Sequence, residues 1–516
     1  MESDQMMGFW PVTTDWLRAR AEASPDATAL RIDERGWRFN ELDGLVSRLC
    51  GRLRAEGVVA GTHVGILMPN SLAAVAHIFA LVRLGAVLVP LNTRLMAAEL
   101  AWQLERADCA LLVCTPSLEA RARAAVRARP LLVAPEKAKA FEPWLGDQPP
   151  LPGSSEAALS FDAHQAIVFT SGTTGYAKGA IVTFANHFWS AVGSAFRLGV
   201  SPDDRWLVCL PLYHVGGLAI LFRSCLYGTT VVLHNGFDVE AVCHSLATEA
   251  ISLISLVPTM LQRLLHEKLT AADAPRLRLA LLGGAALPPD LAEAAQRAGI
   301  PVATSYGLTE AASQVATRLP SEKPAKPGSV GRPLLFTRVA VVDDDDRELP
   351  PGEVGEMVVA GPTVMAGYYG DPETTAAALR GGRLHTGDLG YLDGDGDLWV
   401  LDRRGDLIIS GGENVYPAEV ERVLREHPAV ALACVVGLPD AEWGQRVAAV
   451  VTLHRPGQAT EEELLAFTRE RLAGYKQPRL LVLADDLPQT SSGKIQRRTV
   501  AEQLLAGQSA AQAERA

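Results

Sequence analysis

The sequence predicts an α/β fold. We expect a large N-terminal domain of parallel-sheet αβ layers with a small β-barrel-like part, and a small mobile α+β C-terminal domain. Three patterns support this: short apolar stretches alternate with helical ones over the first two thirds, hairpin patterns begin near Val330, and the alternation returns near the C-terminus. Strands that alternate with helices are typical of parallel sheets covered on both faces.

The N-terminal alternation is clearest in two places. Residues 63–70 and 86–92 read as strands around an apolar helical pattern at 71–85. The rhythm repeats with a strand at 277–282, a helix opened by Pro288 or Pro289, and a strand at 302–304. Proline favours the first position of a helix, which supports that start.

The hairpin region includes the sequence DGDGD at 393–397. An EF-hand loop needs Gly at its sixth position and Glu at its twelfth, and Leu398 and Arg404 stand there instead. We therefore expect a tight turn between two strands. The aspartate run at 343–346 is expected to be a solvated turn.

In the last region Pro417 opens an amphipathic helix, strands follow at 431–438 and 446–454, and Thr460 caps another helix. We expect an N-terminal domain at 1–402, a hinge at 403–406 and a C-terminal domain at 407–516.

Composition narrows the class of protein. The chain has 516 residues, is 48% hydrophobic and carries a formal net charge of −11, which argues against a nonspecific nucleic-acid binder. It shows neither a signal-peptide pattern nor an apolar run long enough for a membrane span, so we expect a cytoplasmic protein without membrane insertion. Its seven cysteines form no C-x-x-C pair and are expected to be buried thiols.

One loop is rich in glycine and hydroxyl groups. The strand at 166–170 runs into FTSGTTGYAKGA at 169–180, with Lys178 as its single cation. Inward-turned glycine amides, hydroxyls and a lysine suit a bound phosphate, although a surface turn has a similar composition. The spacing does not fit a Walker A loop. Gly283, Gly284, Tyr306 and Gly307 are expected in further loops at the carboxyl ends of strands, where ligands of parallel sheets bind.

Six motifs stand in a family order: TSGTTGYAKG, LPLYHVGG, GGAALP, SYGLTE, the segment from HTGDLGY to NVYPAEVE, and QTSSGKIQRR. Together they resemble the adenylate-forming superfamily of acyl-CoA synthetases, luciferases and peptide-synthetase adenylation domains, over essentially the whole chain. The stretches VPLNTRLMAAELAWQL, NHFWSAVGSAFRLG and LPLYHVGGLAILFRSCLYGTTVVLH are most similar to o-succinylbenzoate–CoA ligases of menaquinone biosynthesis.

This resemblance implies an ATP site. Its phosphate loop would comprise Thr170, Ser171, Gly172, Thr173, Thr174, Gly175 and Lys178. Its nucleotide pocket would include Gly284, Ala285, Ala286, Ser305, Tyr306 and Gly307. Thr309 and Glu310 would serve Mg²⁺ and the α-phosphate, Asp388 would accept the ribose hydroxyls, and Arg403 would reach the ribose or phosphate edge. In isolation Asp388 would read as a turn aspartate.

The resemblance also implies residues for the chemistry. Lys494 would bridge the α-phosphate and the attacking carboxylate, although alone it would read as a solvated surface charge. Coenzyme A would pass Gly411, Gly412 and Glu413 after the C-terminal domain moves about the hinge.

The acyl pocket is expected to include His214, Arg223 and Gly284. His214 stands where relatives place a residue that gates the acyl site, and a satisfied core histidine is the alternative. Arg223 lies in an otherwise apolar helix, where a buried cation needs a partner. A second substrate carboxylate would suit it, and an internal salt bridge is the alternative.

The implied activity is an ATP-dependent acid–CoA ligase that forms an acyl-adenylate and then a thioester, with o-succinylbenzoate as the acid. ATP, Mg²⁺, coenzyme A and a small carboxylic acid would be its partners, and a homodimer is left open. The alternatives are a CoA ligase for another aromatic or fatty acid, an adenylation enzyme that loads a carrier protein, and a nucleotide-binding pseudoenzyme.

Overall fold

The computed structural model describes residues 14–126, 128–146, 159–170, 177–322, 326–403, 407–488 and 495–513, without the side chains of 402, 403 and 508–513. The chain divides into two compact units. The first comprises Met1–Thr93, Ala101–Phe169 and Gly179–Leu401. The second comprises Arg94–Leu100, Thr170–Lys178 and Asp402–Ala516.

The first unit contains a 14-stranded sheet with a parallel and an antiparallel part. The parallel part pairs β1, β10, β9, β11, β12 and β13, and β2 joins its edge antiparallel to β1. These strands are β1 (Thr28–Ile32), β2 (Arg35–Arg38), β9 (Arg205–Val208), β10 (Thr230–Leu233), β11 (Leu253–Leu256), β12 (Leu279–Leu282) and β13 (Val302–Leu308).

The antiparallel part continues from β13 through β14, which was not predicted, and includes the strands of the predicted hairpins. Its strands are β14 (Ser313–Arg318), β15 (Ser329–Pro333), β16 (Arg338–Val342), β17 (Gly355–Ala360), β19 (Leu379–Arg380), β20 (Arg383–Leu392) and β21 (Leu398–Arg403). The DGDGD segment is a turn between β20 and β21, as predicted.

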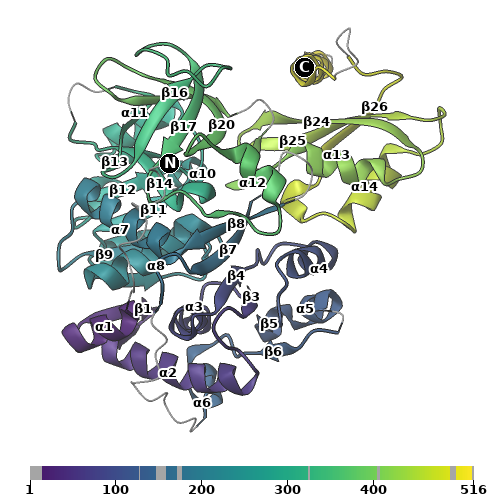
Figure 1. Ribbon diagram of the computed structural model, residues 1–516. Coiled ribbons are helices and arrows are strands. Elements are labelled where there is room, and N and C mark those ends of the chain that lie inside the picture. Colours follow the sequence, from purple (N-terminus) through teal and green to yellow (C-terminus); the bar gives the residue numbers. More distant parts are fainter. Residues whose placement is uncertain are drawn as a thin grey trace, which may run out of the picture. The chain divides into compact units, whose positions relative to one another are not determined.

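A seven-stranded sheet, in which β3 to β7 pair in parallel, completes the strands of this unit (Figure 1). Its order is β18 (Gly367–Tyr368), β8 (Lys178–Thr183), β7 (His164–Thr170), β4 (Val87–Pro90), β3 (His63–Leu67), β5 (Leu111–Cys114) and β6 (Leu131–Val133).

The helices that accompany these sheets are α1 (Trp16–Ala23), α2 (Phe39–Ala55), α3 (Leu72–Leu84), α4 (Ala97–Arg106), α5 (Glu119–Val126), α6 (Ala138–Trp144), α7 (Phe184–Leu198), α8 (Val215–Tyr227), α9 (Val239–Thr248), α10 (Pro258–His266), α11 (Pro289–Arg297) and α12 (Pro372–Ala378). Three short 3₁₀ turns lie at Pro116–Leu118, Ala271–Asp273 and Thr309–Ala311. Proline begins α10, α11 and α12, which agrees with the start predicted for α11.

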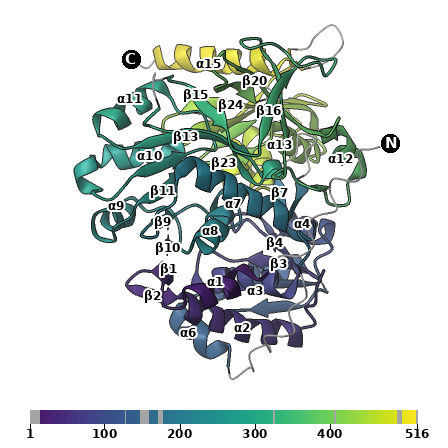
Figure 2. The same ribbon diagram turned by 60° about the vertical axis from the view of Figure 1, so that its left-hand side comes forward.

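Helices cover both faces of the parallel strands. Alternate strand residues enter two different cores: Leu207 and Leu282 pack with α9, α10 and α11, whereas Trp206 and Leu281 pack with α1, α3 and α8. In Figure 2 the first group of helices lies along one side of β11 and β13, with α7 and α8 on the other. All 13 residues of α3 are buried, which explains why its sequence is apolar except for His77 and Arg83.

The second unit is built on a five-stranded sheet of β23 (Glu413–Val415), β22 (Ile408–Ser410), β25 (Gly444–Leu453), β24 (Val430–Asp440) and β26 (Leu480–Leu483). Its helices are α13 (Pro417–Arg425), α14 (Glu461–Arg469) and α15 (Arg497–Ala513), with a 3₁₀ turn at Gly474–Lys476. Thr460 accepts a hydrogen bond from the Glu463 amide, so the predicted cap of α14 is present.

The observed architecture confirms the predicted α/β fold class, with a large sheet-and-helix unit and a smaller α+β unit. Seven cysteines are free thiols and six of them are buried, as expected. Among the described residues no helix is long and apolar enough to cross a membrane. The predicted boundaries at 402 and 407 stay predictions.

Candidate functional site

The end of β13 differs from the predicted loop. Tyr306 and Gly307 lie within β13, because the chain turns back and β14 pairs with them, Tyr306 opposite Ala316 and Gly307 opposite Gln314. A Cβ at Gly307 would lie 2.0 Å from the carbonyl oxygen of Ser313, so only glycine permits this approach. The turn itself is strained, since Ala312 and Ser313 both have positive φ, of 51° and 100°.

This turn carries the predicted magnesium ligands. Thr309 and Glu310 form its 3₁₀ helix, and the backbone carbonyl of Glu310 accepts a hydrogen bond from the Met365 amide. The Tyr368 hydroxyl donates to the Glu310 carboxylate at 3.0 Å. A tyrosine from β18 therefore helps to orient this carboxylate, and the strained backbone fixes where it projects.

Asp388 and Tyr306 are brought together from two different strands. The Tyr306 hydroxyl donates to Oδ2 of Asp388 at 2.6 Å, and both side chains are buried. The Asp388 amide donates to Oγ1 of Thr386, whose hydroxyl donates in turn to the carbonyl of Met357. The structure thus joins two predicted nucleotide contacts, and a charge-assisted bond of this kind fixes the carboxylate strongly.

The remaining adenine-site candidates lie at the ends of β12 and β13. Gly284 follows β12 with a φ of +82°, a conformation that L side chains rarely adopt, and Ala285 and Ala286 continue the same loop. Ser305 lies in β13 and its hydroxyl bonds to the carbonyl of Ala316 and to Oγ1 of Thr317. Ser305 therefore helps to hold β14 against β13.

Several predicted site residues fall outside the described residues. Thr170 ends β7 and Lys178 begins β8, and the Thr170 hydroxyl donates to the carbonyl of Lys178 at 3.5 Å. Outside the described part lie Ser171, Gly172, Thr173, Thr174, Gly175, Lys494, hinge residues 404–406 and the side chain of Arg403.

His214 is the N-cap residue of α8, and its ring makes an edge contact with that of Tyr213 at a centroid distance of 4.7 Å. The local turn needs a glycine, since a Cβ at Gly217 would lie 2.4 Å from the carbonyl oxygen of Pro211. His214 is half-buried, so it is placed at a helix start and is not sealed in the core.

Arg223 is among the most deeply buried side chains of the chain, at 2% exposure. One of its nitrogens donates to the Ser190 hydroxyl at 3.1 Å, its guanidinium lies 5.9 Å from the Trp206 ring, and Nε has no partner in the structure. Burial lowers the pKa of the guanidinium, and Tyr227 partly offsets this. In the part of the chain that is described, no carboxylate forms an ion pair with it, so the salt-bridge alternative finds no support.

The surroundings of Arg223 add no negative charge. His187 lies beside it on α7, where burial, and secondly the charge of Arg223, lower the pKa of the imidazole to about 3. Among the described residues, neither ring nitrogen of His187 has a hydrogen-bond partner. Among the described residues the guanidinium is therefore buried without a compensating negative charge, which is costly unless a ligand supplies one.

The second unit holds the predicted coenzyme A residues. Gly411 and Gly412 form the turn between β22 and β23, with φ of 59° and 82°, as two-residue hairpin turns require. A Cβ at Gly411 would lie 2.7 Å from the Trp443 ring. Hairpin geometry and close packing thus account for these glycines, and the buried Glu413 begins β23.

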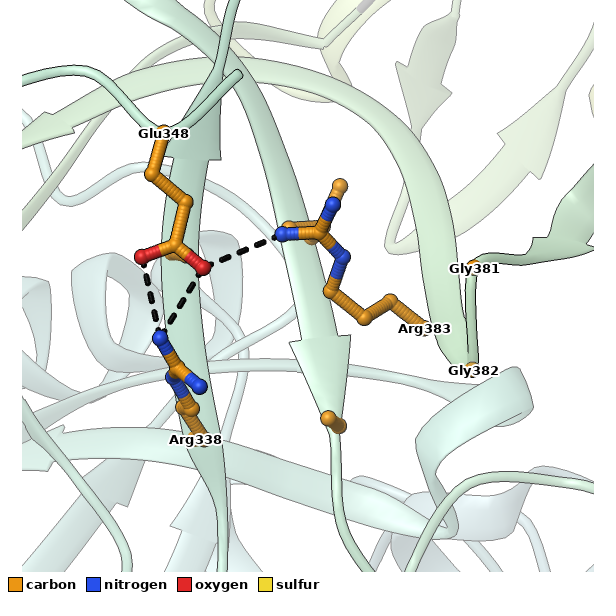
Figure 3. Close-up of a pocket in the computed structure, with 8 residues that line it drawn as sticks. Arg338, Glu348, Gly381, Gly382 and Arg383 are labelled. Carbon is orange, nitrogen blue, oxygen red and sulfur yellow. Dashed lines mark hydrogen bonds and ion pairs between the residues drawn. The ribbon is translucent and has the colours of Figure 1, made fainter. Parts of the chain in front are cut away.

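A cavity of about 470 Å³ lies elsewhere in the first unit, against β16, β17 and β20 (Figure 3). Arg338 and Arg383 both donate to Glu348 there, so one carboxylate is shared by two guanidinium groups. Its described lining contains none of the predicted site residues.

Two neighbours of the site had no signal in the sequence. Tyr368 stands in β18, a two-residue strand that pairs with β8 and that no sequence pattern predicted. Glu356 stands in a hairpin segment whose pattern reads as an ordinary strand. Their contacts with Glu310 and with the Gly387 amide depend on strand register, which periodicity does not specify.

Comparison with known protein families identifies the family of this chain. The family model for the AMP-binding enzyme matches residues 17–369, and the family model for the AMP-binding enzyme C-terminal domain matches residues 419–494. The chain belongs to the AMP-binding enzyme family. A 2-succinylbenzoate–CoA ligase of Bacillus cereus is 42% identical over 485 residues, which are 94% of this chain and 97% of the relative.

Solved structures of this family agree. The o-succinylbenzoate CoA synthetase of Bacillus subtilis, as a double mutant bound to its product analogue OSB-NCoA, is 40% identical with a TM-score of 0.89, covering 95% of this chain and 98% of that one. Its complex with ATP and magnesium gives 0.72 at 40% identity, covering 94% and 99%. An amide bond synthetase of Marinactinospora thermotolerans gives 0.85 at 30% identity, covering 94% and 99%.

Proposed function

We propose that this enzyme joins 2-succinylbenzoate, also called o-succinylbenzoate, to coenzyme A at the expense of ATP, in menaquinone biosynthesis. Attack of the substrate carboxylate on the α-phosphate would give an acyl-adenylate and pyrophosphate. The thiol of coenzyme A would then displace AMP and form the thioester. The observation that carries this proposal is the 42% identity to 2-succinylbenzoate–CoA ligases over 94% of the chain.

The geometry of the first unit supports a nucleotide site. Asp388 is buried and is oriented by the hydroxyl of Tyr306, which suits a carboxylate that accepts ribose hydroxyls. Arg403 would assist at the same end of the nucleotide. Gly284, Ala285, Ala286, Ser305 and Gly307 leave little side-chain bulk beside Tyr306, as a flat adenine requires.

The phosphates of ATP would be bound by the glycine-rich loop and by Mg²⁺. Thr170, the glycine-rich residues 171–175 and Lys178 would hold the β- and γ-phosphates. Thr309 and Glu310 offer only oxygen donors, which are the ligands that Mg²⁺ prefers, and Tyr368 holds the Glu310 carboxylate in place. When bound, Mg²⁺ would neutralise phosphate charge. Lys494 would bring a positive charge to the α-phosphate.

Arg223 supports the choice of acid. 2-Succinylbenzoate has a second carboxylate besides the one that is activated, and a buried guanidinium without an ionic partner in the described chain matches it. His214 and Gly284 would line the same pocket. Gly411, Gly412 and Glu413 would contact coenzyme A during the second step.

The test measures pyrophosphate release and the thioester product with ATP, Mg²⁺ and coenzyme A. The acids are 2-succinylbenzoate, benzoate and octanoate. We expect 2-succinylbenzoate to give the highest kcat/KM. Preference for benzoate or octanoate would assign another acyl-CoA synthetase, and adenylate without thioester would point to a carrier protein or an amine as acceptor.

The role of Lys494 is tested in the two half-reactions. Lys494→Ala should slow adenylate formation about 100- to 1,000-fold, because a charge that stabilises the transition state is lost. Thioester formation from supplied acyl-adenylate should stay near the wild-type rate. Lys139→Ala, an exposed lysine of α6, is the control. Equal losses in both half-reactions would contradict this role.

A cytoplasmic location and a homodimer complete the proposal. Size-exclusion chromatography with light scattering measures the second directly.

A further inference from the structure

The strand that carries Asp388 has an irregular pairing next to that residue. Between β17 and β20 the register runs from Glu356 opposite Leu389 to Val358 opposite His385, so β17 advances by two residues while β20 advances by four. The extra residues of β20 form a bulge in which Gly387 has a φ of +72°. Bulges often re-aim a side chain, and here they lift Asp388 out of the regular ladder.

Glu356 fills this bulge. Its Oε1 accepts the Gly387 amide at 2.9 Å, and Oε2 lies 3.1 Å from Nδ1 of His385. Arg380 lies 3.5 Å from the same Oε2. The Glu356 carboxylate therefore binds the residues on both sides of Thr386. One of them, Gly387, directly precedes Asp388 in the chain.

The Glu356 side chain is 14% exposed and that of His385 only 3%. A bulge removes backbone groups from their strand partners, and an amide that loses its partner without gaining another acceptor destabilises the fold. Glu356 supplies that acceptor for Gly387. The bulged conformation, and with it the direction of Asp388, depends on this contact.

We propose that Glu356 is a positioning residue for the nucleotide, which acts by holding the 385–388 bulge so that Asp388 faces the ribose hydroxyls. This rests on the ribose role of Asp388 in the proposed function. Glu356 itself touches no substrate in this assignment. Tyr306 holds the carboxylate from the other side through Oδ2.

The test compares KM for ATP and for 2′,3′-dideoxy-ATP in adenylate formation, at saturating acid. Glu356→Ala should raise KM for ATP about tenfold, from the loss of one buried acceptor. It should raise KM for the dideoxy nucleotide much less, because that nucleotide offers no ribose hydroxyls. KM for the acid should stay unchanged, and Glu356→Gln should restore most of the ATP affinity, since its amide oxygen can accept the Gly387 N–H.

Glu348→Gln is the matched control. Glu348 pairs with Arg338 and Arg383 (Figure 3), and none of its contacts among the described residues involves 385–388, so its loss should change neither KM. If Glu356→Ala does not fold, Glu356→Asp can replace it, because the shorter side chain keeps the charge but withdraws the carboxylate from Gly387. KM for ATP and for the dideoxy nucleotide is then compared in that variant.

Equal increases in KM for both nucleotides would overturn the proposal, because Glu356 would then act on general stability. A wild-type enzyme that does not distinguish ATP from its dideoxy analogue would instead overturn the ribose role of Asp388. The two failures are therefore distinguishable.

Discussion

The burial of the Arg223 charge is best explained by a negatively charged ligand that binds beside it. Its guanidinium is buried on α8 with a serine hydroxyl and an aromatic ring as neighbours, and the adjacent His187 is neutral at physiological pH. An unpaired buried cation normally destabilises a fold. A binding site that contains such a cation can bind an anion tightly, because the anion compensates the buried charge.

Replacing Arg223 by Leu should raise KM for 2-succinylbenzoate about tenfold or more, because a charge-assisted contact is lost, and leave KM for ATP unchanged. The apo Tm should stay equal or rise, since the leucine removes an uncompensated charge. Steady-state kinetics and thermal melting measure both. Arg297→Leu, an exposed arginine of α11, is the control. An unchanged KM for the acid, or a large fall in Tm, would contradict the assignment.

At the scale of elements, the turn between β20 and β21 is organised around one lysine. Nζ of Lys326 lies 2.7, 2.8 and 2.6 Å from carboxylate oxygens of Asp393, Asp395 and Asp397. These three carboxylates form the arrangement that could hold a metal ion, and the ammonium occupies its centre. Although burial acts in the opposite direction, hydrogen bonds from Lys326 and Trp399 lower the pKa of Asp393.

Lys326→Met should therefore lower Tm at pH 7 by roughly 2 °C or more, because the three carboxylates lose the cation that they share, although Asp397 keeps an ion pair with Arg318. A depressed carboxyl pKa contributes stability above the ordinary value of about 4, and this contribution is lost as pH falls below it. The difference in Tm between variant and wild type should shrink at pH 3. Arg347→Met, from the exposed pair with Asp345, is the control. A difference of undiminished size at pH 3 would contradict this explanation.

The same elements show what could be predicted from sequence. The boundaries of α3 and α13 follow from apolar periodicity and from Pro417, which are local properties. The pairing of β1 with β10 joins residues about 200 positions apart, and no local pattern encodes it. Asp388 could likewise be proposed from its motif, which is local. The contact of Glu356 with Gly387 could not be predicted, because it depends on a register shift between two strands.

At the scale of the whole first unit, two buried histidines make stability depend on pH. Burial lowers the pKa of His77 on α3 to about 4 and that of His187 on α7 to about 3. In the unfolded chain both titrate near 6.5, so the unfolded state binds more protons as pH falls from 6.5 towards 4. Each group then removes about 1.4 kcal/mol of stability per pH unit, while above pH 6.5 neither contributes.

We expect Tm to fall steadily between pH 6.5 and 4.5, and His77→Phe to flatten this slope. Phe141 and Trp144 already pack against the His77 ring, so an aromatic replacement is tolerated there. His266→Gln changes an exposed histidine and should leave the slope unaltered. Thermal melting across this range measures the slope. A slope that His77→Phe leaves unchanged would show that other groups control the acid response.

The complete burial of α3 has a consequence for how this unit comes apart. Side chains of the seven-stranded sheet and of the parallel strands share one continuous core with that helix. If either sheet separated from the helix, α3 would expose to water a surface that is apolar except for His77 and Arg83. The two sheets are therefore expected to melt as one cooperative block, and a fragment cut between them would expose a surface that promotes aggregation.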